Sequence, residues 1–357
     1  MPTDQDYILT MNKAIKNLVG NAIKVSLRKP AFSKFIVKNL LWQSTAEKLR
    51  AEWEKKGYHI PAFLIASITS QCNLTCTGCY DRINSSKCTQ ELTTQRWLEV
   101  FTEAKELGIS FILIAGGEPF IREDLLKLLG KIPEIIFPIF TNGTHIDEHT
   151  IHILEGSRNL IPIISLEGYE NDTDARRGEG IYQTILQGMD ALSHKNIFFG
   201  TSITVTCENF DLVTSTEFVN NFIQKGCKSF LYVEYVPIDG KTEHLEISSS
   251  QRLKLAKVLL QLRENYASLF ISFPGDENQM GGCLSSGRGF VHINASGDLE
   301  PCPFSPYSDV NLFQINLKEA LQSKFLKSIR DSNEHLSETE HGCALFHKKD
   351  WVQSLLK

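Results

Sequence analysis

The chain has 357 residues, of which 42% are hydrophobic and 22% charged, and its formal net charge is −5. This composition is typical of a soluble globular protein with two or three domains. The net charge gives no general case for binding nucleic acid, and no apolar run approaches the roughly 18–20 residues that a membrane span needs. The nine cysteines are scattered, without a compact framework, so a cytoplasmic, reduced protein is expected.

The first 57 residues are predicted to form a basic amphipathic helical segment. Residues 7–46 contain lysines and arginines but no acidic residue. Apolar residues at helical spacing predict one helix before Pro30 and a second, short helix after it, followed by a polar helix over Thr45–Lys56. This segment can pack on the main domain with its basic face in solvent, or it can make peripheral contact with an anionic membrane or an acidic partner.

Strand-like and helix-like runs alternate six times over residues 58–240, which we expect to form the core domain. Such alternation predicts parallel strands joined by right-handed crossovers, as in an open doubly wound sheet or a partial barrel. In both folds ligands bind at the carboxyl ends of the strands. The six predicted strands are Phe63–Thr69, Ser110–Ala115, Phe137–Thr141, Ile161–Leu166, Ile197–Thr206 and Ser229–Val236.

Three cysteines follow the first predicted strand with the spacing C-x3-C-x2-C, at Cys72, Cys76 and Cys79. Thiolates on one short loop can each bind an iron of a cubane cluster and leave the fourth iron without a protein ligand. An iron with an open position can coordinate and reduce a small molecule. A structural zinc site would need four ligands, usually in C-x2-C pairs, so the spacing favours the cluster.

A glycine-rich motif, Gly116-Gly117-Glu118-Pro119, follows the second predicted strand. Its glycines would let the backbone approach a ligand closely, and Glu118 could accept hydrogen bonds from a ligand ammonium group. The third predicted strand ends in a turn that contains Asn142.

The fourth predicted strand ends in Ser165-Leu-Glu167. Strand alternation puts Ser165 and Glu167 on the same side, where a hydroxyl and a carboxylate could bind a ribose. Arg176 and Arg177 follow, and one of them could pair with a carboxylate of the site or remain a solvated loop charge.

In this order, the three motifs resemble those of the radical S-adenosylmethionine (radical SAM) enzymes over about residues 60–240. The resemblance implies a partial (β/α)6 TIM-like barrel and a [4Fe–4S] cluster held by Cys72, Cys76 and Cys79, with exchangeable SAM on the open iron. It implies that Gly116, Gly117 and Glu118 receive the amino group of SAM. It also implies that Ser165 and Glu167 contact its ribose. The candidate cofactor-binding residues are therefore Gly116, Gly117, Glu118, Pro119, Ser165, Glu167, Tyr80 and Asn142.

One position departs from that family's pattern. The residue before the last cysteine is often aromatic and lies near the adenine, whereas here it is Gly78, with Tyr80 on the other side of Cys79. The side chain that covers the adenine is thus left open.

Residues 241–357 are predicted to form a linker helix and a small α+β domain with a second cysteine set, Cys283, Cys302 and Cys343. A β-hairpin over Phe290–Glu300 would bring Cys283 and Cys302 together. This pattern is similar to SPASM and the shorter twitch extensions, which hold auxiliary iron–sulfur clusters; twitch fits better because the later SPASM cysteines are missing.

The fourth ligand of this second site is left open between a bound substrate and a local side chain such as His341, His347 or Cys88. A zinc site made by three cysteines and a histidine is the alternative. Cys207 and Cys227 are expected to be ordinary core residues.

We therefore expect a radical SAM oxidoreductase or modifying enzyme that forms a 5′-deoxyadenosyl radical and abstracts hydrogen from a substrate carbon. Cleaving a sulfonium C–S bond requires a strong one-electron donor held against the sulfur, and a cysteine-bound cubane can reach the required low potential. A one-electron donor of the flavodoxin or ferredoxin type is the expected partner. Peptide or protein modification and cofactor maturation are the expected roles, with a peptide or small-molecule substrate. The alternatives are a lipid or amphiphilic substrate at a membrane surface, or a non-catalytic iron–sulfur sensor or scaffold; no catalytic side chain is assigned, and the fold cannot choose the substrate.

Overall fold

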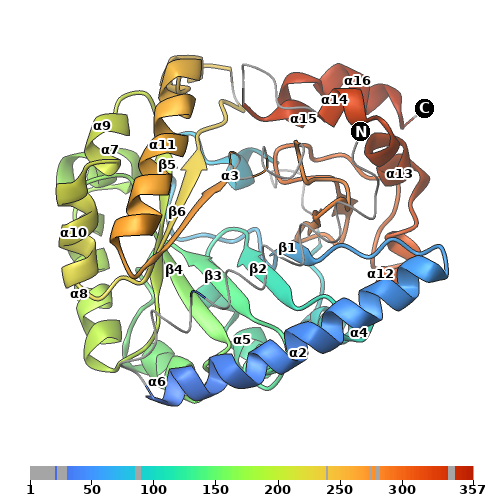
Figure 1. Ribbon diagram of the computed structural model, residues 1–357, viewed down its shortest axis with the longest axis horizontal. Helices are drawn as coiled ribbons and strands as arrows, with labels where there is room; N and C mark the ends of the chain where they lie inside the picture. Colours follow the sequence, from blue (N-terminus) through green and yellow to red (C-terminus); the bar gives the residue numbers. More distant parts are fainter. Residues whose placement is uncertain are drawn as a thin grey trace.

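The computed structural model describes residues 21, 30–84, 90–238, 240–273, 275, 277, 282–336 and 342–356. Within these residues, nine strands form one curled sheet in the order β7-β6-β5-β4-β3-β2-β1-β8-β9 (Figure 1). The strands are β1 Phe63–Ser67, β2 Phe111–Ala115, β3 Phe137–Thr141, β4 Leu160–Leu166, β5 Gly200–Val205, β6 Ser229–Glu234, β7 Leu269–Phe273, β8 Phe290–Ile293 and β9 Leu299–Glu300.

Every neighbouring pair of strands is parallel except β8 with β9. The strands are near-continuous apolar runs, as in Phe-Ile-Leu-Ile-Ala of β2, because both faces of the sheet are covered. The predicted α/β fold with a partial barrel is thus confirmed. The sheet extends beyond the six predicted strands, with β7 added at one edge and β8 and β9 at the other.

Helices cover the outer face of the sheet (Figure 1). α4 shows how the core forms: Trp97 stacks on Phe101 at 5.3 Å between ring centroids, and Phe101 meets Phe137 of β3 edge-on at 5.8 Å. The helices along the barrel are α4 Thr94–Leu107, α5 Glu123–Leu129, α6 Glu148–Gly156, α7 Glu170–Arg177, α8 Ile181–His194, α9 Phe210–Val213, α10 Thr216–Gln224 and α11 Ser249–Asn265. Shorter elements are α3 Tyr80–Asn84, η2 Pro119–Arg122, η3 Glu243–Leu245, α12 Leu317–Ala320, α13 Lys324–Asp331, α14 Asn333–Leu336, α15 Ala344–His347 and α16 Lys349–Ser354.

A single helix, α2 Pro30–Lys55, replaces the two helices predicted on either side of Thr45. No glycine or proline interrupts it, and the Thr45 hydroxyl donates to the Leu41 carbonyl one turn back at 3.2 Å. Arg50 donates a hydrogen bond to the carbonyl of Gly108, which fixes α2 against the end of α4. The predicted helix before Pro30 lies almost entirely outside the described residues.

The C-terminal region joins the barrel sheet. β8 pairs with β1 in the register Phe63↔Phe290, and the predicted hairpin is present as the antiparallel pair β8 and β9. A buried polar chain strengthens this edge: Ser67 Oγ lies 2.8 Å from His292 Nε2, and His292 Nδ1 lies 2.7 Å from Glu300 Oε2. The predicted domain divisions near residues 57 and 240 stay predictions.

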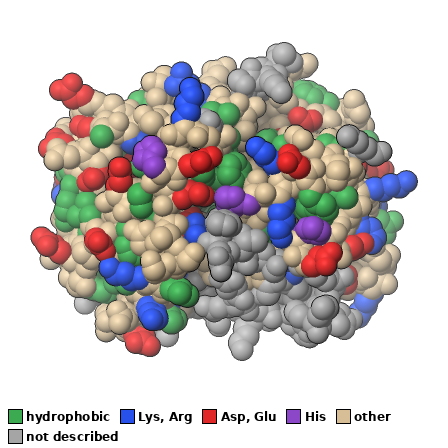
Figure 2. Space-filling view, turned by 90° about the horizontal axis from the view of Figure 1, so that it is seen from above, with side chains coloured by type: hydrophobic (Ala, Val, Ile, Leu, Met, Phe, Trp, Pro, Cys, Tyr) green, Lys and Arg blue, Asp and Glu red, His purple; other side chains and the backbone are tan. Residues whose placement is uncertain are grey.

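Charged side chains of both signs lie on the molecular surface. On the face shown in Figure 2, the acidic and basic side chains of the described residues are interspersed. Among the helices of the described chain, none is both long and apolar enough to cross a membrane.

Candidate functional site

The cysteine loop connects β1 to α3 at the carboxyl end of β1. Its three cysteines are free thiols; Cys72 is exposed, and Cys76 and Cys79 are half-buried. Two N–H groups approach Cys72 Sγ, the Leu74 backbone at 3.5 Å and Asn142 Nδ2 at 3.9 Å. Hydrogen bonds to sulfur stabilise thiolate charge and tune the potential of iron–sulfur clusters, so this loop suits a cluster.

Burial and two nearby arginines shift the pKa values of the cysteine thiols. Burial raises the pKa of Cys72 and Cys76, and the guanidinium of Arg177, with that of Arg176, opposes the rise at Cys76. Thiolates that are costly to form in the bare protein are favoured when a metal binds them. In the part of the chain that the structure describes, no three His, Cys, Asp or Glu side chains are grouped to hold a single metal ion. The thiolates of a cubane each bind a different iron.

The glycines of the Gly-Gly-Glu-Pro motif press against the cysteine loop. Gly117 N donates to Thr69 O and Glu118 N donates to Gln71 O, both at 2.8 Å. A Cβ atom on Gly117 would lie 2.0 Å from Gln71 O, which only glycine avoids. These backbone contacts fix the residues just before Cys72; the predicted contact of the motif with a ligand stays a prediction.

Replacing Gly117 with alanine should therefore displace the cysteine loop. The new methyl group would overlap backbone, which cannot move as a flexible side chain does, so we expect less iron after anaerobic reconstitution and less SAM cleavage than in the wild type. Gly156→Ala is the matched control, because nothing lies within 4 Å of a Cβ added at that helical position. Equal iron content in the two variants would show that the close approach does not position the cysteines.

Glu118 is fully buried and joins the ends of two strands. Its carboxylate accepts hydrogen bonds from Thr141 Oγ1 at 2.8 Å, Asn142 N at 2.7 Å and Phe120 N at 3.1 Å. Burial raises the pKa of this carboxyl, and the three donors counteract part of that rise. A carboxylate offers about four acceptor positions, of which these donors use three. Pro119 begins the short helix η2.

Asn142 connects the turn after β3 to the cysteine loop. Besides its approach to Cys72, its Nδ2 donates to Asn73 Oδ1 at 2.8 Å, and its Oδ1 accepts from Thr144 N at 2.9 Å. The predicted site residue is thus adjacent to the first cysteine.

Glu167, which is 3% exposed, forms ion pairs with both arginines that follow it. Arg176 Nη1 lies 2.6 Å from Glu167 Oε1, and Arg177 Nε lies 2.6 Å from Oε2. Arg176 also donates to Thr77 O at 3.1 Å, and Thr77 N donates to Arg176 O at 3.0 Å. One arginine was expected to pair with a carboxylate of the site, and two do so. The hydrogen bonds between Arg176 and Thr77 hold the cysteine loop against α7.

Ser165, on the same strand, is half-buried. Its hydroxyl makes no hydrogen bond to any described residue, whereas the Glu167 carboxylate is engaged by arginines. Of the two residues predicted to contact ribose, Ser165 is therefore the one whose side chain is not already engaged by another described residue.

Two tyrosines flank the last cysteine. Tyr80 begins α3, and its ring meets Phe304 edge-on at 5.3 Å, toward the C-terminal cysteines. Gly78 has a φ of +65°, and a Cβ there would lie 2.2 Å from Tyr235 Oη. Tyr235 thus occupies the space beside residue 78. The sequence analysis missed it, because Tyr235 lies inside the predicted sixth strand, whereas the observed strand β6 ends one residue earlier, at Glu234.

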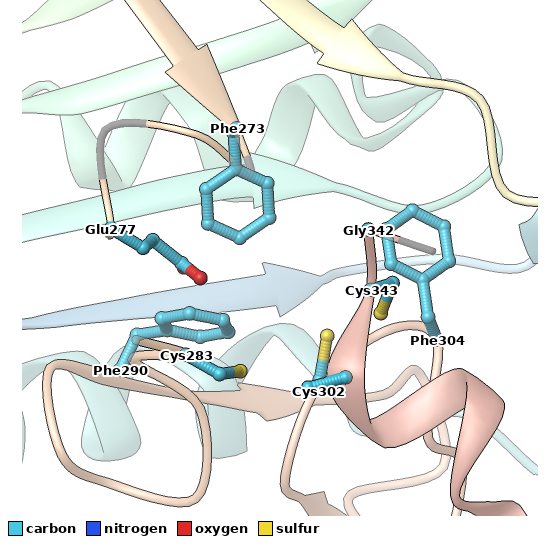
Figure 3. Close-up of a pocket in the computed structure, with 9 residues that line it drawn as sticks. Phe273, Glu277, Cys283, Phe290, Cys302, Phe304, Gly342 and Cys343 are labelled. Atoms are coloured by element: carbon cyan, nitrogen blue, oxygen red, sulfur yellow. The ribbon is translucent and has the colours of Figure 1, made fainter. Parts of the chain in front are cut away.

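The second cysteine set lines one pocket, which is also lined by Phe273 of β7 and Phe290 of β8. Figure 3 shows Cys283, Cys302 and Cys343 around this pocket with Glu277 and aromatic rings. Burial raises the pKa of the Cys283 and Cys302 thiols far above their usual range and that of Cys343 to about 12. The structure therefore gathers the three cysteines around one pocket, and the predicted hairpin carries two of them, Cys283 and Cys302, into it.

The other residues named for the second site lie elsewhere or are not described. His347 Nε2 lies 3.5 Å from Glu246 Oε1 and does not line the pocket. His341 and Cys88 lie outside the described residues. Cys227 is fully buried, and the half-buried Cys207 donates to His244 O at 3.0 Å. Glu277 had no sequence signal, since no motif surrounds it.

Residues 66–218 match the Radical SAM superfamily model. This segment belongs to the radical SAM superfamily. The protein is a radical SAM enzyme, so a [4Fe–4S] cluster and SAM are its cofactors. The alternative of a non-catalytic sensor is thereby removed.

Known proteins resemble the chain beyond the matched segment. The "AdoMet-dependent heme synthase" of Methanosarcina barkeri is 23% identical over 303 residues, which cover 77% of this chain and 86% of that protein. The crystal structure of Streptococcus suis SuiB bound to precursor peptide SuiA has a TM-score of 0.64 and 18% identity, over 83% of this chain and 72% of SuiB. The structure of anSMEcpe with bound AdoMet and Cp18Cys peptide has a TM-score of 0.57 and 17% identity, over 79% of this chain and 83% of that one. At these identities the likeness to both structures establishes a shared fold.

Proposed function

We propose that Cys72, Cys76 and Cys79 hold the [4Fe–4S] cluster and leave one iron for SAM. The observation that carries this proposal is the anchoring of the cysteine loop at the carboxyl end of β1, by backbone hydrogen bonds to Gly117 and Glu118 on one side and by Thr77 with Arg176 on the other. When bound, the reduced cluster supplies the electron that cleaves SAM and yields a 5′-deoxyadenosyl radical. A flavodoxin or ferredoxin is the proposed electron donor.

The residues around the loop would orient SAM. The free hydroxyl of Ser165 is suited to a ribose hydroxyl, and Glu118, with one acceptor position left, to the ammonium group. The shape of the loop would depend on Gly116, Gly117, Pro119 and Asn142. Glu167 would position the loop indirectly, by holding Arg176 and Arg177 in place. The adenine would be bordered by Tyr80 or Tyr235. The mouth of the barrel would exclude water from the radical.

For the substrate, we propose a peptide or protein. Support comes from SuiB and anSMEcpe, which share the fold of this chain over most of its length and were solved with peptides. A second candidate is a tetrapyrrole in cofactor maturation, which the named heme synthase favours. Contact of the basic N-terminal segment with membranes, and an amphiphilic substrate there, stay predictions; exposed Val37 and Leu41 on α2 are the described residues suited to it.

Hydrogen transfer distinguishes these substrates. Deuterated peptides made from any short reading frames found next to the gene would be incubated with the reduced enzyme and SAM. Porphyrins deuterated in their carboxylate side chains would be incubated with them separately. We expect mass spectrometry to detect deuterium in 5′-deoxyadenosine with the peptide. Label from the porphyrin alone would favour the second candidate, and label from neither would contradict both.

A further inference from the structure

We propose that Glu277 is the fourth protein ligand of an iron–sulfur cluster held by Cys283, Cys302 and Cys343. This inference rests on the proposed auxiliary cluster in the C-terminal region. Glu277 lines the same pocket as the three cysteines, and Figure 3 shows its carboxylate directed into that pocket, above the ring of Phe290. It is the one acidic side chain among the described residues that line the pocket.

Three chain segments bring the four side chains together. Gly282 N donates to Glu277 O at 3.1 Å, which holds the residue before Cys283 close to Glu277. Cys302 follows β9 in a turn closed by the hydrogen bond from Ser305 N to Cys302 O at 2.9 Å. Cys343 directly precedes α15. The backbone therefore presents one carboxylate and three thiols to one space.

The surroundings of these groups are apolar. Glu277 is 4% exposed, and the pocket walls are the rings of Phe273, Phe290 and Phe304. Besides burial, the charge of Glu277 contributes to the raised pKa of each of the three thiols, which shows that it lies near all of them. A carboxylate and three thiolates in an apolar pocket repel one another, and a cationic metal centre removes that cost because buried charges are tolerated when they bind metals.

Neighbouring side chains are less suitable as the fourth ligand. The carboxylate of Glu234 is close to Gly342, but its Oε1 lies 2.6 Å from Arg252 Nε. His347 faces Glu246 instead of the pocket. With Glu277 bound, all four irons have protein ligands, so the auxiliary cluster would exchange electrons without coordinating the substrate.

The test isolates the C-terminal centre by replacing Cys72, Cys76 and Cys79 with alanine. This background protein and three further variants, Glu277→Cys, Glu277→Ala and the control Glu234→Gln, would be reconstituted anaerobically with iron and sulfide. Iron content, the EPR spectrum of the reduced cluster and its midpoint potential would be measured, with circular dichroism as the check of folding.

We expect Glu277→Cys to keep about four irons. Its midpoint potential should be lower than that of the background protein, since a thiolate is a softer and stronger donor to iron than a carboxylate. Glu277→Ala should lose one iron on mild oxidation and give a [3Fe–4S] EPR signal, whereas Glu234→Gln should match the background protein. If Glu277→Ala does not fold, the potential of Glu277→Cys decides alone.

Two results would overturn the proposal: the same potential and EPR spectrum in Glu277→Cys as in the background protein, or a C-terminal centre that contains zinc and no iron. Because the first cysteine set is absent from these proteins, their spectra do not depend on SAM cleavage. Failure of the proposed radical chemistry in the intact enzyme would thus be recognised separately.

Discussion

Replacing Cys72, Cys76 and Cys79 with alanine should lower the iron content of the reconstituted protein by about four atoms per chain. The three thiols are on one loop, and N–H donors already approach Cys72 Sγ from two sides. Without the thiolates nothing on this loop can hold a cubane. Iron and sulfide analysis of wild type and variant, prepared side by side, gives the difference.

Cys207→Ala provides the control for that experiment. Cys207 is a half-buried free cysteine that donates to a backbone carbonyl, and it belongs to neither cysteine set. Its removal should leave the iron content unchanged. A triple variant that retains all the iron of the wild type would contradict the assignment of the cluster to this loop.

The second large effect is expected for Glu167→Gln. The substitution leaves Arg176 and Arg177 facing a neutral amide inside the protein, and removing one partner of a buried ion pair costs about 3–5 kcal/mol. The free energy of unfolding from urea titration should fall by that amount, and the cysteine loop should bind iron less well because Arg176 also holds Thr77. Glu99→Gln, which breaks an exposed ion pair with Arg96, should have little effect.

The effect of Glu167→Gln should depend on pH. Burial disfavours the Glu167 carboxylate, but Arg177 and Arg176 outweigh burial and lower its pKa below the ordinary value. A lowered pKa in the folded state means that the stabilisation is complete above the unfolded-state pKa of about 4.3 and is lost as the pH falls through the folded-state value. The difference in unfolding free energy between wild type and variant should therefore shrink below about pH 4.3. A difference that stays constant on acidification would contradict the ion-pair explanation.

The barrel and its motifs could be predicted because their signals are local. Apolar runs separated by helical periodicity identify six parallel strands, and ligand-binding motifs of such folds follow strand ends. The strand β7 was not predicted, and neither was the pairing of the hairpin strand β8 with β1, since both depend on contacts between segments far apart in the sequence. The parallel pairing of Phe63 with Phe290 leaves no trace in either segment alone.

Side-chain partners were the least predictable part of the site. Strand alternation put Ser165 and Glu167 on the same side, but it could not show that two arginines engage Glu167 and leave Ser165 free. The pattern Gly-Gly-Glu-Pro predicted that its backbone lies close to a ligand. The structure shows that this backbone lies close to the cysteine loop. Tyr235 and Glu277 reach the two cysteine sets through tertiary packing, which no spacing encodes.

The measurement that tests the central claim most directly is the release of 5′-deoxyadenosine. Anaerobically reconstituted, reduced wild-type protein supplied with SAM should release it, and the variant without Cys72, Cys76 and Cys79 should release none. Wild-type protein that carries an intact four-iron cluster on this loop and still releases no 5′-deoxyadenosine would contradict the account.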